Sequence, residues 1–483
     1  MRRTAGPGAH GGKRKMLGKL IKDIFAGDEA EAPVPTPAPT PAAAASQSQP
    51  QPPATPEFVP PHSASAYQGK IFITFIGDSR SDGLAAGAHA LADITRAEGY
   101  DFRLIDVRKD TWRQEITDLM SRPEEVCCIF SSMGFADGWV APHPSGPRSL
   151  WRETGIPFIS GIGDHPAYFW DRHISRGPGF SSMYLFQEHV DAALAWMNPV
   201  PQMGLLPPWA RDTVEKQEMD FGKKEAGEIY FFKNGNNPHA LLEFWRGLPQ
   251  PMSGWLLELI HSYDMLKLGR SLKPLHELVV DFLRDRQFYP GPPSWIQIFM
   301  VAQLDDYARR LKSTLIGEAL LDLPVHVFGD NWGHVDFTGR RATHHEGQSY
   351  FKTRGLINNA LALIDMSPNT ESAPHDRFMA AIGRHTMCLN NTQQYYLDNY
   401  ESAERMLFEF DAESIRQKVV EVMENPKAYV DYGVAVAERA RIIHPPSAVV
   451  DRVVECARMT RFAGARSEFV GQQDFVNWPP TLR

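Results

Sequence analysis

The chain has 483 residues with 38 prolines, and eleven of those prolines fall between Pro33 and Pro61. This clustering excludes a single uniform globular body, and the length suggests two or three domains. Lysine and arginine total 50 against 58 acidic residues, a net charge of −8 that argues against a general nucleic-acid binder. The four cysteines include no CxxC pair, which argues against a zinc knuckle or a dithiol site and fits a reducing cytoplasm.

Residues 1–66 are predicted to lack a folded core. Within them, residues 16–25 read MLGKLIKDIF and place their apolar side chains on one helical stripe. The proline- and alanine-rich segment 32–61 indicates an extended linker. The short helix has two readings: docking on a membrane surface or a partner protein, or no role at all. The start of the chain does not predict a secretory signal peptide, so we expect a cytoplasmic protein, peripheral to the inner face of the membrane if the helix docks there.

Beyond residue 66, strands and helices alternate in two series. In the first, strands are expected at 70–76, 101–107, 126–130 and 157–160, with helices at 84–98 and 111–121. In the second, strands are expected at 229–232, 325–328, 360–364 and 386–389, with helices within 239–320 and at 377–383, 411–424, 426–441 and 446–462. Alternation of this kind predicts an α/β protein with two doubly wound parallel sheets.

The predicted domains follow from these two series. Residues 67–225 form an amino-terminal Rossmann-like domain, and residues 226–445 form a second one with a helical insertion at about 239–320. Residues 446–483 form a terminal helix and tail that crosses back to the first domain. In parallel sheets, ligands bind beyond the carboxyl ends of the strands. The loops at 77–83 and 161–166 are therefore expected at a binding crevice.

One loop resembles a catalytic motif of another class. Residues 75–79 read FIGDS, which resembles the nucleophile block of GDSL/SGNH ester hydrolases. That chemistry needs a histidine base with an aspartate partner, but no histidine here has an aspartate three residues before it. An ester hydrolase that uses Ser79 is therefore a minor alternative to a crevice loop that carries Asp78.

The histidines do not predict a metal site. His344 and His345 are adjacent in sequence, and His326 and His334 lie nearby. Adjacent side chains on a strand point to opposite faces, and the chain has no HExxH motif. Structural or surface roles are therefore expected for them.

The most specific stretch follows the strand at 360–364. It leads to a helix start that carries His375, Asp376 and Arg377. A helix N-terminus together with an arginine can hold a diphosphate. Alternatively, Asp376 caps the helix and Arg377 pairs with it on the surface. The residues alone leave the two readings equal.

This region resembles the donor-binding half of GT-B glycosyltransferases, specifically the spore-maturation (CgeB-like), group 1 type. The resemblance rests on the end of a strand at Ser367-Pro368, the His-Asp-Arg helix start and the pattern over 410–427. Upstream, Asp164-His165-Pro166 and the segments 204–210 and 327–332 match in the same order, over roughly residues 67–460 in all. Many group 1 enzymes carry a glutamate near this helix start that holds the donor ribose. This chain has no carboxylate around Phe378, so the ribose contact would fall to Glu371 or Asp376.

The resemblance implies transfer of a sugar from a nucleotide-sugar to an acceptor such as a protein or a cell-surface glycan, without a metal or another cofactor. The implied diphosphate contacts are Lys233, His375 and Arg377. The rest of the implied donor pocket comprises Asn236, Gly329, Asn331, Trp332, Ser367, Asn369, Glu371 and Asp376. The candidate catalytic residues on the acceptor side are Asp78, Asp164 and His165, one of which would be the general base if the enzyme inverts.

Two readings of a different kind remain open. The segment 164–166 has a structural alternative, a turn closed by an Asx-type cap. A non-catalytic scaffold of the same fold, tethered through its amino-terminal helix, is the alternative for the whole protein.

Overall fold

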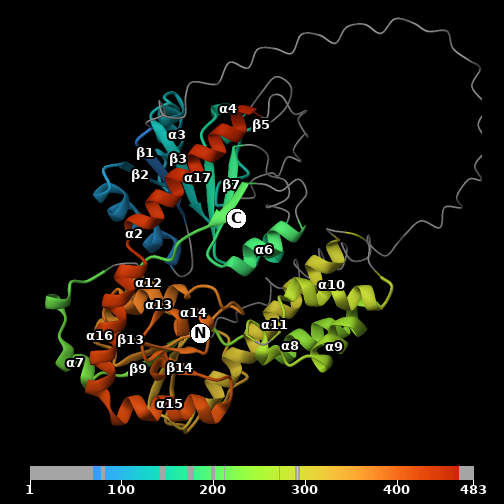
Figure 1. Cartoon of the computed structure of the whole chain (residues 1–483), viewed down its shortest axis with the longest axis vertical. Helices are drawn as coiled ribbons and strands as arrows, with labels where there is room; N and C mark the ends of the chain where they lie inside the picture. The colour runs from blue at the N-terminus through green and yellow to red at the C-terminus, as the bar shows by residue number, and fades with distance from the viewer. Residues whose placement is uncertain are drawn as a thin grey trace, which may run out of the picture.

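A computed structural model describes residues 69–77, 82–141, 148–170, 179–196, 202–210, 213–270, 272–288, 291 and 294–466 (Figure 1). The predicted helix at 16–25, the linker at 32–61, Asp78 and Ser79 lie outside this part of the chain. Among the described residues, no helix is long and apolar enough to cross a membrane.

The first sheet belongs to the amino-terminal half. Its six strands are β1 (Ile71–Ile76), β2 (Asp101–Asp106), β3 (Val126–Ser132), β6 (Phe158–Ile162), β7 (Phe180–Tyr184) and β8 (Gln202–Leu205), in the order β2-β1-β3-β6-β7-β8. All neighbouring strands in this sheet run parallel. The helices of this half are α2 (Gly83–Ala97), α3 (Trp112–Met120), α4 (Leu150–Thr154) and α6 (Gln187–Trp196). The sequence analysis missed β7 and β8, because FSSMY and QMGL lack a clear apolar pattern and are placed by their neighbours.

The second sheet is also parallel and has six strands. These are β9 (Ile229–Phe232), β10 (Val325–Phe328), β11 (Thr343–His345), β12 (Ala362–Ile364), β13 (Met387–Asn391) and β14 (Leu407–Phe408), in the order β11-β10-β9-β12-β13-β14. Its flanking helices include α7 (Phe221–Glu225), α12 (Tyr350–Asn359), α13 (Asp376–Ile382), α14 (Gln394–Asn399), α15 (Ala412–Glu424) and α16 (Pro426–Ile443). Numbered within the unit, this is the 3-2-1-4-5-6 order of dinucleotide-binding folds. The predicted fold class of two Rossmann-like α/β domains is confirmed by these two parallel sheets and their helices.

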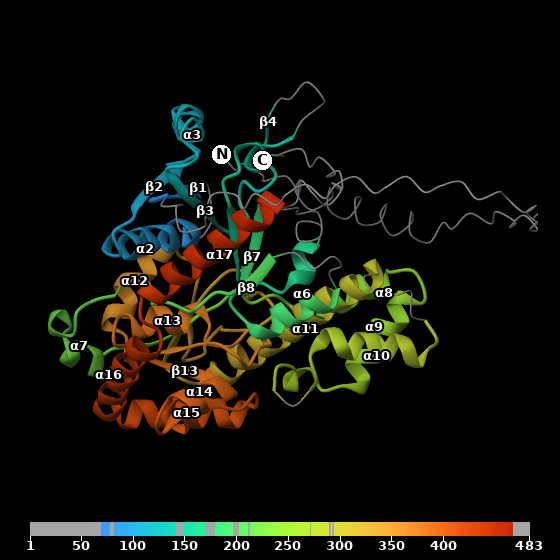
Figure 2. The same cartoon turned by 45° about the horizontal axis from the view of Figure 1, so that its top comes forward.

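The predicted helical insertion packs against the first half of the chain. It contains α8 (Pro238–Arg246), α9 (Met252–Ser262), α10 (Leu275–Asp285) and the long α11 (Trp295–Leu320). One apolar core joins Trp245, Leu256 and Val301 of the insertion to Tyr184 and Trp196 of the amino-terminal half. Figure 2 shows α6 beside the insertion. The insertion therefore ties the two sheets together.

The last helix of the second half also packs against the first half of the chain. Helix α17 (Ser447–Arg466) follows α16 and lies across the first sheet (Figure 1). Val449, Val450 and Val453 are buried there against Phe72 and Met183. The amino-terminal sheet thus completes one of its faces with residues from the far end of the sequence.

Trp332 fixes the spacing between the second sheet and α11. Its side chain is buried and packs where two glycines leave room. A Cβ at Gly317 would lie 2.4 Å from the Trp332 ring, and a Cβ at Gly235 would lie 2.1 Å from it. The glycines are needed for close approach, although glycine weakens a helix such as α11.

We predict that Gly317→Ala destabilises the protein by about 1–3 kcal/mol through overpacking, although alanine is the better helix former. Gly355→Ala is the matched control, because a Cβ at this exposed helical glycine would meet no atom within 4 Å. The control should stabilise slightly. Urea unfolding of both variants, and of Gly317→Ala combined with Trp332→Phe, checks this. Strictly additive effects in the double variant would contradict the proposed contact.

Candidate active site

The two sheets turn the carboxyl ends of their strands toward a shared cavity of about 290 Å³. From the first sheet it is lined by Met133 after β3, Asp164 after β6 and Phe186 after β7. From the second sheet it is lined by Lys233 after β9 and Ser367 after β12. Strands β9 and β12 are neighbours at the point where the strand order reverses, which is where such sheets bind ligands. The expectation that strand-end loops gather at one crevice is confirmed for the described residues.

Lys233 is held at the cavity by its backbone. Its N–H donates to the carbonyl of Phe328 at 2.8 Å, and its own carbonyl accepts from the Trp332 indole at 2.8 Å. Burial, together with the nearby Arg377 and Arg309, lowers the pKa of Lys233 to about 7, and the Asp365 and Asp164 carboxylates offset this only in part. A desolvated ammonium beside other cations favours an anionic ligand, because such a ligand restores the missing counter-charge.

Four of the predicted donor residues are absent from the cavity lining, and two of them, Gly329 and Trp332, contact the Lys233 backbone instead. Asn331 donates to Asn236 at 3.0 Å, and Trp332 is buried beneath the loop. A Cβ at Gly329 would lie 2.1 Å from the Lys233 carbonyl oxygen, so close backbone packing requires the glycine. The structure therefore does not bring these four residues into the cavity.

A buried carboxylate, Asp365, organises the start of α13. Arg377 donates to it at 2.6 Å, and the His375 ring lies 3.2 Å from it. Burial raises the pKa of Asp365, but the two cationic partners outweigh this and hold it at about 2. Burial lowers the pKa of His375, yet the Asp376 and Asp365 carboxylates bring it above its usual value. His375 and Asp376 line the cavity, with Arg377 paired to Asp365 beside them.

The structural alternative for this helix start named the wrong residues, whereas the diphosphate reading stays a prediction. The helix start is capped at His375 and not at Asp376, with the Nδ1 of His375 3.5 Å from the Arg377 backbone nitrogen. Arg377 pairs with Asp365 and not with Asp376. The sequence analysis passed over Asp365 because it directly follows a buried strand and belongs to no recognised motif.

Helix α11 supplies a cation that the sequence analysis missed. Arg309 lines the cavity and donates to Asp164 at 3.1 Å. Its Nε lies 3.0 Å from the buried Asp305 carboxylate, one helical turn earlier. Asp305 also accepts hydrogen bonds from Tyr168 at 2.8 Å and from Asn369 at 2.9 Å. The only sequence signal for this arrangement was the i, i+4 spacing of Asp305 and Arg309.

Three other predicted residues lie beside a second, smaller cavity of about 200 Å³, which is lined by His165, Asn369 and Glu371 among others. His165 is buried, and its Nδ1 accepts from the Ala167 N–H. Burial lowers the pKa of His165 to about 4, so its ring is neutral. His165 thus caps the turn after β6 and is not among the residues that line the larger cavity, and its catalytic role stays a prediction.

Asn369 is also committed to structural contacts. Its amide donates to Asp305, and its carbonyl oxygen accepts from Lys312 at 2.7 Å. Glu371 receives no such bonds on its side chain from the described residues, and burial raises the pKa of its carboxyl group. The backbone N–H of Glu371 donates to Glu188 on α6 at 2.6 Å, a further contact between the two halves.

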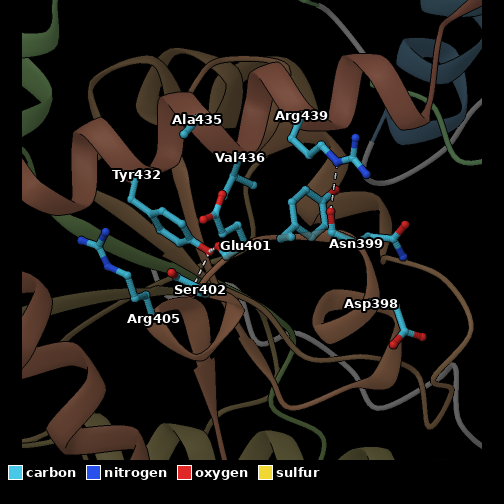
Figure 3. Close-up of a pocket in the computed structure, with 10 residues that line it drawn as sticks. Asp398, Asn399, Glu401, Ser402, Arg405, Tyr432, Ala435, Val436 and Arg439 are labelled. Atoms are coloured by element: carbon cyan, nitrogen blue, oxygen red, sulfur yellow. Dashed lines mark hydrogen bonds between the residues drawn. The ribbon is translucent and has the colours of Figure 1, made fainter.

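A wider groove of about 690 Å³ lies away from the cleft, between α16 and residues 398–405 (Figure 3). Its polar groups are largely directed at the protein itself. Tyr432 donates to the carbonyls of Glu401 and Ser402, and Arg439 donates to that of Asn399. The two arginines and two carboxylates of the groove also balance in charge. Size alone therefore does not make it the candidate site.

Comparisons with known proteins do not assign this chain to a family. No protein-family model and no curated protein matches the sequence. Similar solved structures include a glycosyltransferase from Rickettsia africae (8% identity, 82% of this chain and 99% of that chain, TM-score 0.37). An Anabaena protein solved with UDP and glucose gives 8% identity over 80% and 99% of the two chains, with a TM-score of 0.38. Sucrose-phosphate synthase from Thermosynechococcus elongatus gives 7% identity over 81% and 98%, with a TM-score of 0.40. Similarities this low carry no argument about activity.

Because the pKa of Lys233 is lowered, we predict that diphosphate binding takes up a proton. A bound diphosphate should favour the charged ammonium, so binding above about pH 7 requires uptake of a proton and affinity should fall as the pH rises. The last ionisation of a nucleoside diphosphate lies near pH 6 and is complete at pH 8, so the ligand itself contributes no proton. Calorimetry of UDP, GDP, ADP or CDP binding at pH 8, in two buffers of different ionisation enthalpy, measures the uptake. Lys233→Met should abolish it, and unchanged uptake in that variant would assign the proton to another group such as His375.

Proposed function

We propose that the protein transfers a glycosyl group from a nucleotide-sugar to an acceptor hydroxyl in the cleft between its two sheets. The observation that carries the proposal is the convergence of Lys233, Arg309 and His375 on one cavity at the switch point of a dinucleotide-type sheet. Anions bind where such positive groups converge on the carboxyl ends of parallel strands. The resemblance of residues 360–427 to the donor half of group 1 enzymes, of the spore-maturation type, agrees with this location.

In this proposal the second domain binds the donor. The bond between the sugar and the diphosphate breaks, and negative charge develops on the leaving diphosphate. Lys233, Arg309 and His375 stabilise that charge. Asp305 and Asp365 already hold Arg309 and His375, and the backbone of Lys233 is fixed, so little reorganisation is needed. Arg377 acts through the same Asp365 carboxylate that orients His375. Side chains would thus carry out the neutralisation without a metal ion, and donor hydrolysis that persists in EDTA would support this.

The first domain presents the acceptor side. Asp164 is its one carboxylate among the described residues that line the cavity, and its side chain is 44% exposed. A carboxylate there can accept a hydrogen bond from the acceptor hydroxyl and, in an inverting reaction, its proton. The acceptor itself, a protein or a glycan, is set by surface loops that follow no general code.

Two other functions predict different results. A non-catalytic scaffold predicts no turnover of any nucleotide-sugar and no thermal stabilisation by UDP, GDP, ADP or CDP. An ester hydrolase predicts esterase activity that disappears in Ser79→Ala, a residue outside the described part of the chain. Incubation with radiolabelled nucleotide-sugars, followed by detection of the free sugar, separates the transferase from the other two, and an esterase assay separates the hydrolase from the scaffold.

We predict that Lys233→Met, which keeps the length of the side chain and removes its charge, weakens nucleoside diphosphate binding about tenfold to a hundredfold. Lys427→Met is the matched control, because Lys427 is exposed and pairs with Asp431 on α16. The control should bind as the wild type does. Calorimetry with the same four nucleotides measures both, and equal affinity of the Lys233 variant and the wild type would contradict the assignment.

A further inference from the structure

Arg309 has two carboxylate partners of very different character. Asp305 is buried, with its side chain 2% exposed, and it also accepts from Tyr168 and Asn369. Asp164 is 44% exposed and makes one hydrogen bond, at 3.1 Å, to the Nη1 of Arg309. The inner partner is therefore fixed by a network, whereas the outer partner is held by a single contact at the cavity wall.

The Arg309 guanidinium also has a nitrogen whose hydrogen bonds are unused within the described part of the chain. Its Nη2 is buried, and no atom of the described residues accepts a hydrogen bond from it. The side chain is 19% exposed and stacks near the Tyr168 ring, with 5.6 Å between the Cζ atom and the ring centroid. Asp305 and Tyr168 thus hold Arg309 in place whether or not Asp164 remains paired with it.

We propose that Asp164 is an exchangeable partner of Arg309, which the donor diphosphate displaces on binding. This inference rests on the proposed function. A diphosphate carries more negative charge than one carboxylate, and it can accept two parallel bonds from a guanidinium, including one from the unused Nη2. It therefore competes successfully for Arg309 with a half-exposed carboxylate, whose ion pair is weak.

This exchange implies an order in which the two substrates bind. While Asp164 is paired with Arg309, its hydrogen-bonding capacity is partly taken up and it is a poorer partner for an acceptor hydroxyl. Once the diphosphate takes its place, Asp164 is a free carboxylate on the acceptor side of the cavity. The donor must then bind before the acceptor is engaged, and Arg309 couples the two steps because it binds the diphosphate and releases Asp164.

The decisive variant is Asp164→Asn, which keeps the shape of the side chain and removes the competing charge. Because the residue is half-exposed, the substitution leaves folding intact. We expect pyrophosphate and UDP, GDP, ADP or CDP to bind about fivefold more tightly than to the wild type, the equivalent of one partly exposed ion pair. Donor hydrolysis should become slower in the same variant, because the acceptor-side carboxylate is gone.

Asp306→Asn is the matched control. Asp306 pairs with Arg310 at 2.6 Å on the same helix, and Arg310 donates to the carbonyl of Asn237 instead of lining the cavity. Its affinity for the same ligands should equal that of the wild type. A second variant, Asp164→Ala, should repeat the tightening seen with asparagine.

The outcomes separate the two proposals. If the wild type binds these ligands and both Asp164 variants bind equally or more weakly, the exchange is wrong while the proposed function stands. If neither the wild type nor any variant binds them, the proposed function fails. Tighter binding in both Asp164 variants, with Asp306→Asn unchanged, supports the exchange.

Discussion

The structure depends on the buried carboxylate of Asp305. It lies on α11 and receives Tyr168 from the first half of the chain, Asn369 from the loop after β12, and Arg309 from its own helix. Burial raises the pKa of Asp305, but these partners, Arg309 foremost, keep it below its usual value. One charge inside the protein thus fixes both walls of the cleft and the cation between them. Losing a partner from such a network is costly, because it leaves a buried charge uncompensated.

Asp365 repeats the arrangement on the other side of the cavity. It holds Arg377 and orients His375, as Asp305 holds Arg309. The result is a set of cations whose positions are determined by carboxylates placed behind them. Among the described residues no carboxylate forms an ion pair with Lys233, and burial together with Arg377 and Arg309 lowers its pKa. The cavity therefore has an excess of positive charge, and an anion with several negative charges is the ligand that neutralises it.

The sequence predicted the features that depend on local patterns of residues. Alternating strands and helices predicted both sheets, and the rule about strand ends placed Asp164, Lys233 and Ser367 at the cleft. It could not reveal Arg309, because a residue in the middle of a 26-residue helix reaches the site only through tertiary packing. The motifs also assigned Trp332 and Asn369 to a ligand. In the structure Trp332 packs against two glycines, and Asn369 donates to Asp305. Both contacts join residues far apart in sequence, which a local motif cannot show. Short motifs locate a site, but they do not tell which of their side chains face it.

The central claim is that the diphosphate of a nucleotide-sugar lies between Lys233, at the end of β9, and Arg309, in the middle of α11. A crystal structure of the protein soaked with UDP, GDP, ADP or CDP tests it most directly. The account predicts phosphate oxygens within hydrogen-bond distance of Lys233 Nζ and the Arg309 guanidinium, with Asp164 released from Arg309. A nucleotide bound instead in the groove between α16 and residues 398–405, or one in the cleft that touches neither cation, would contradict it.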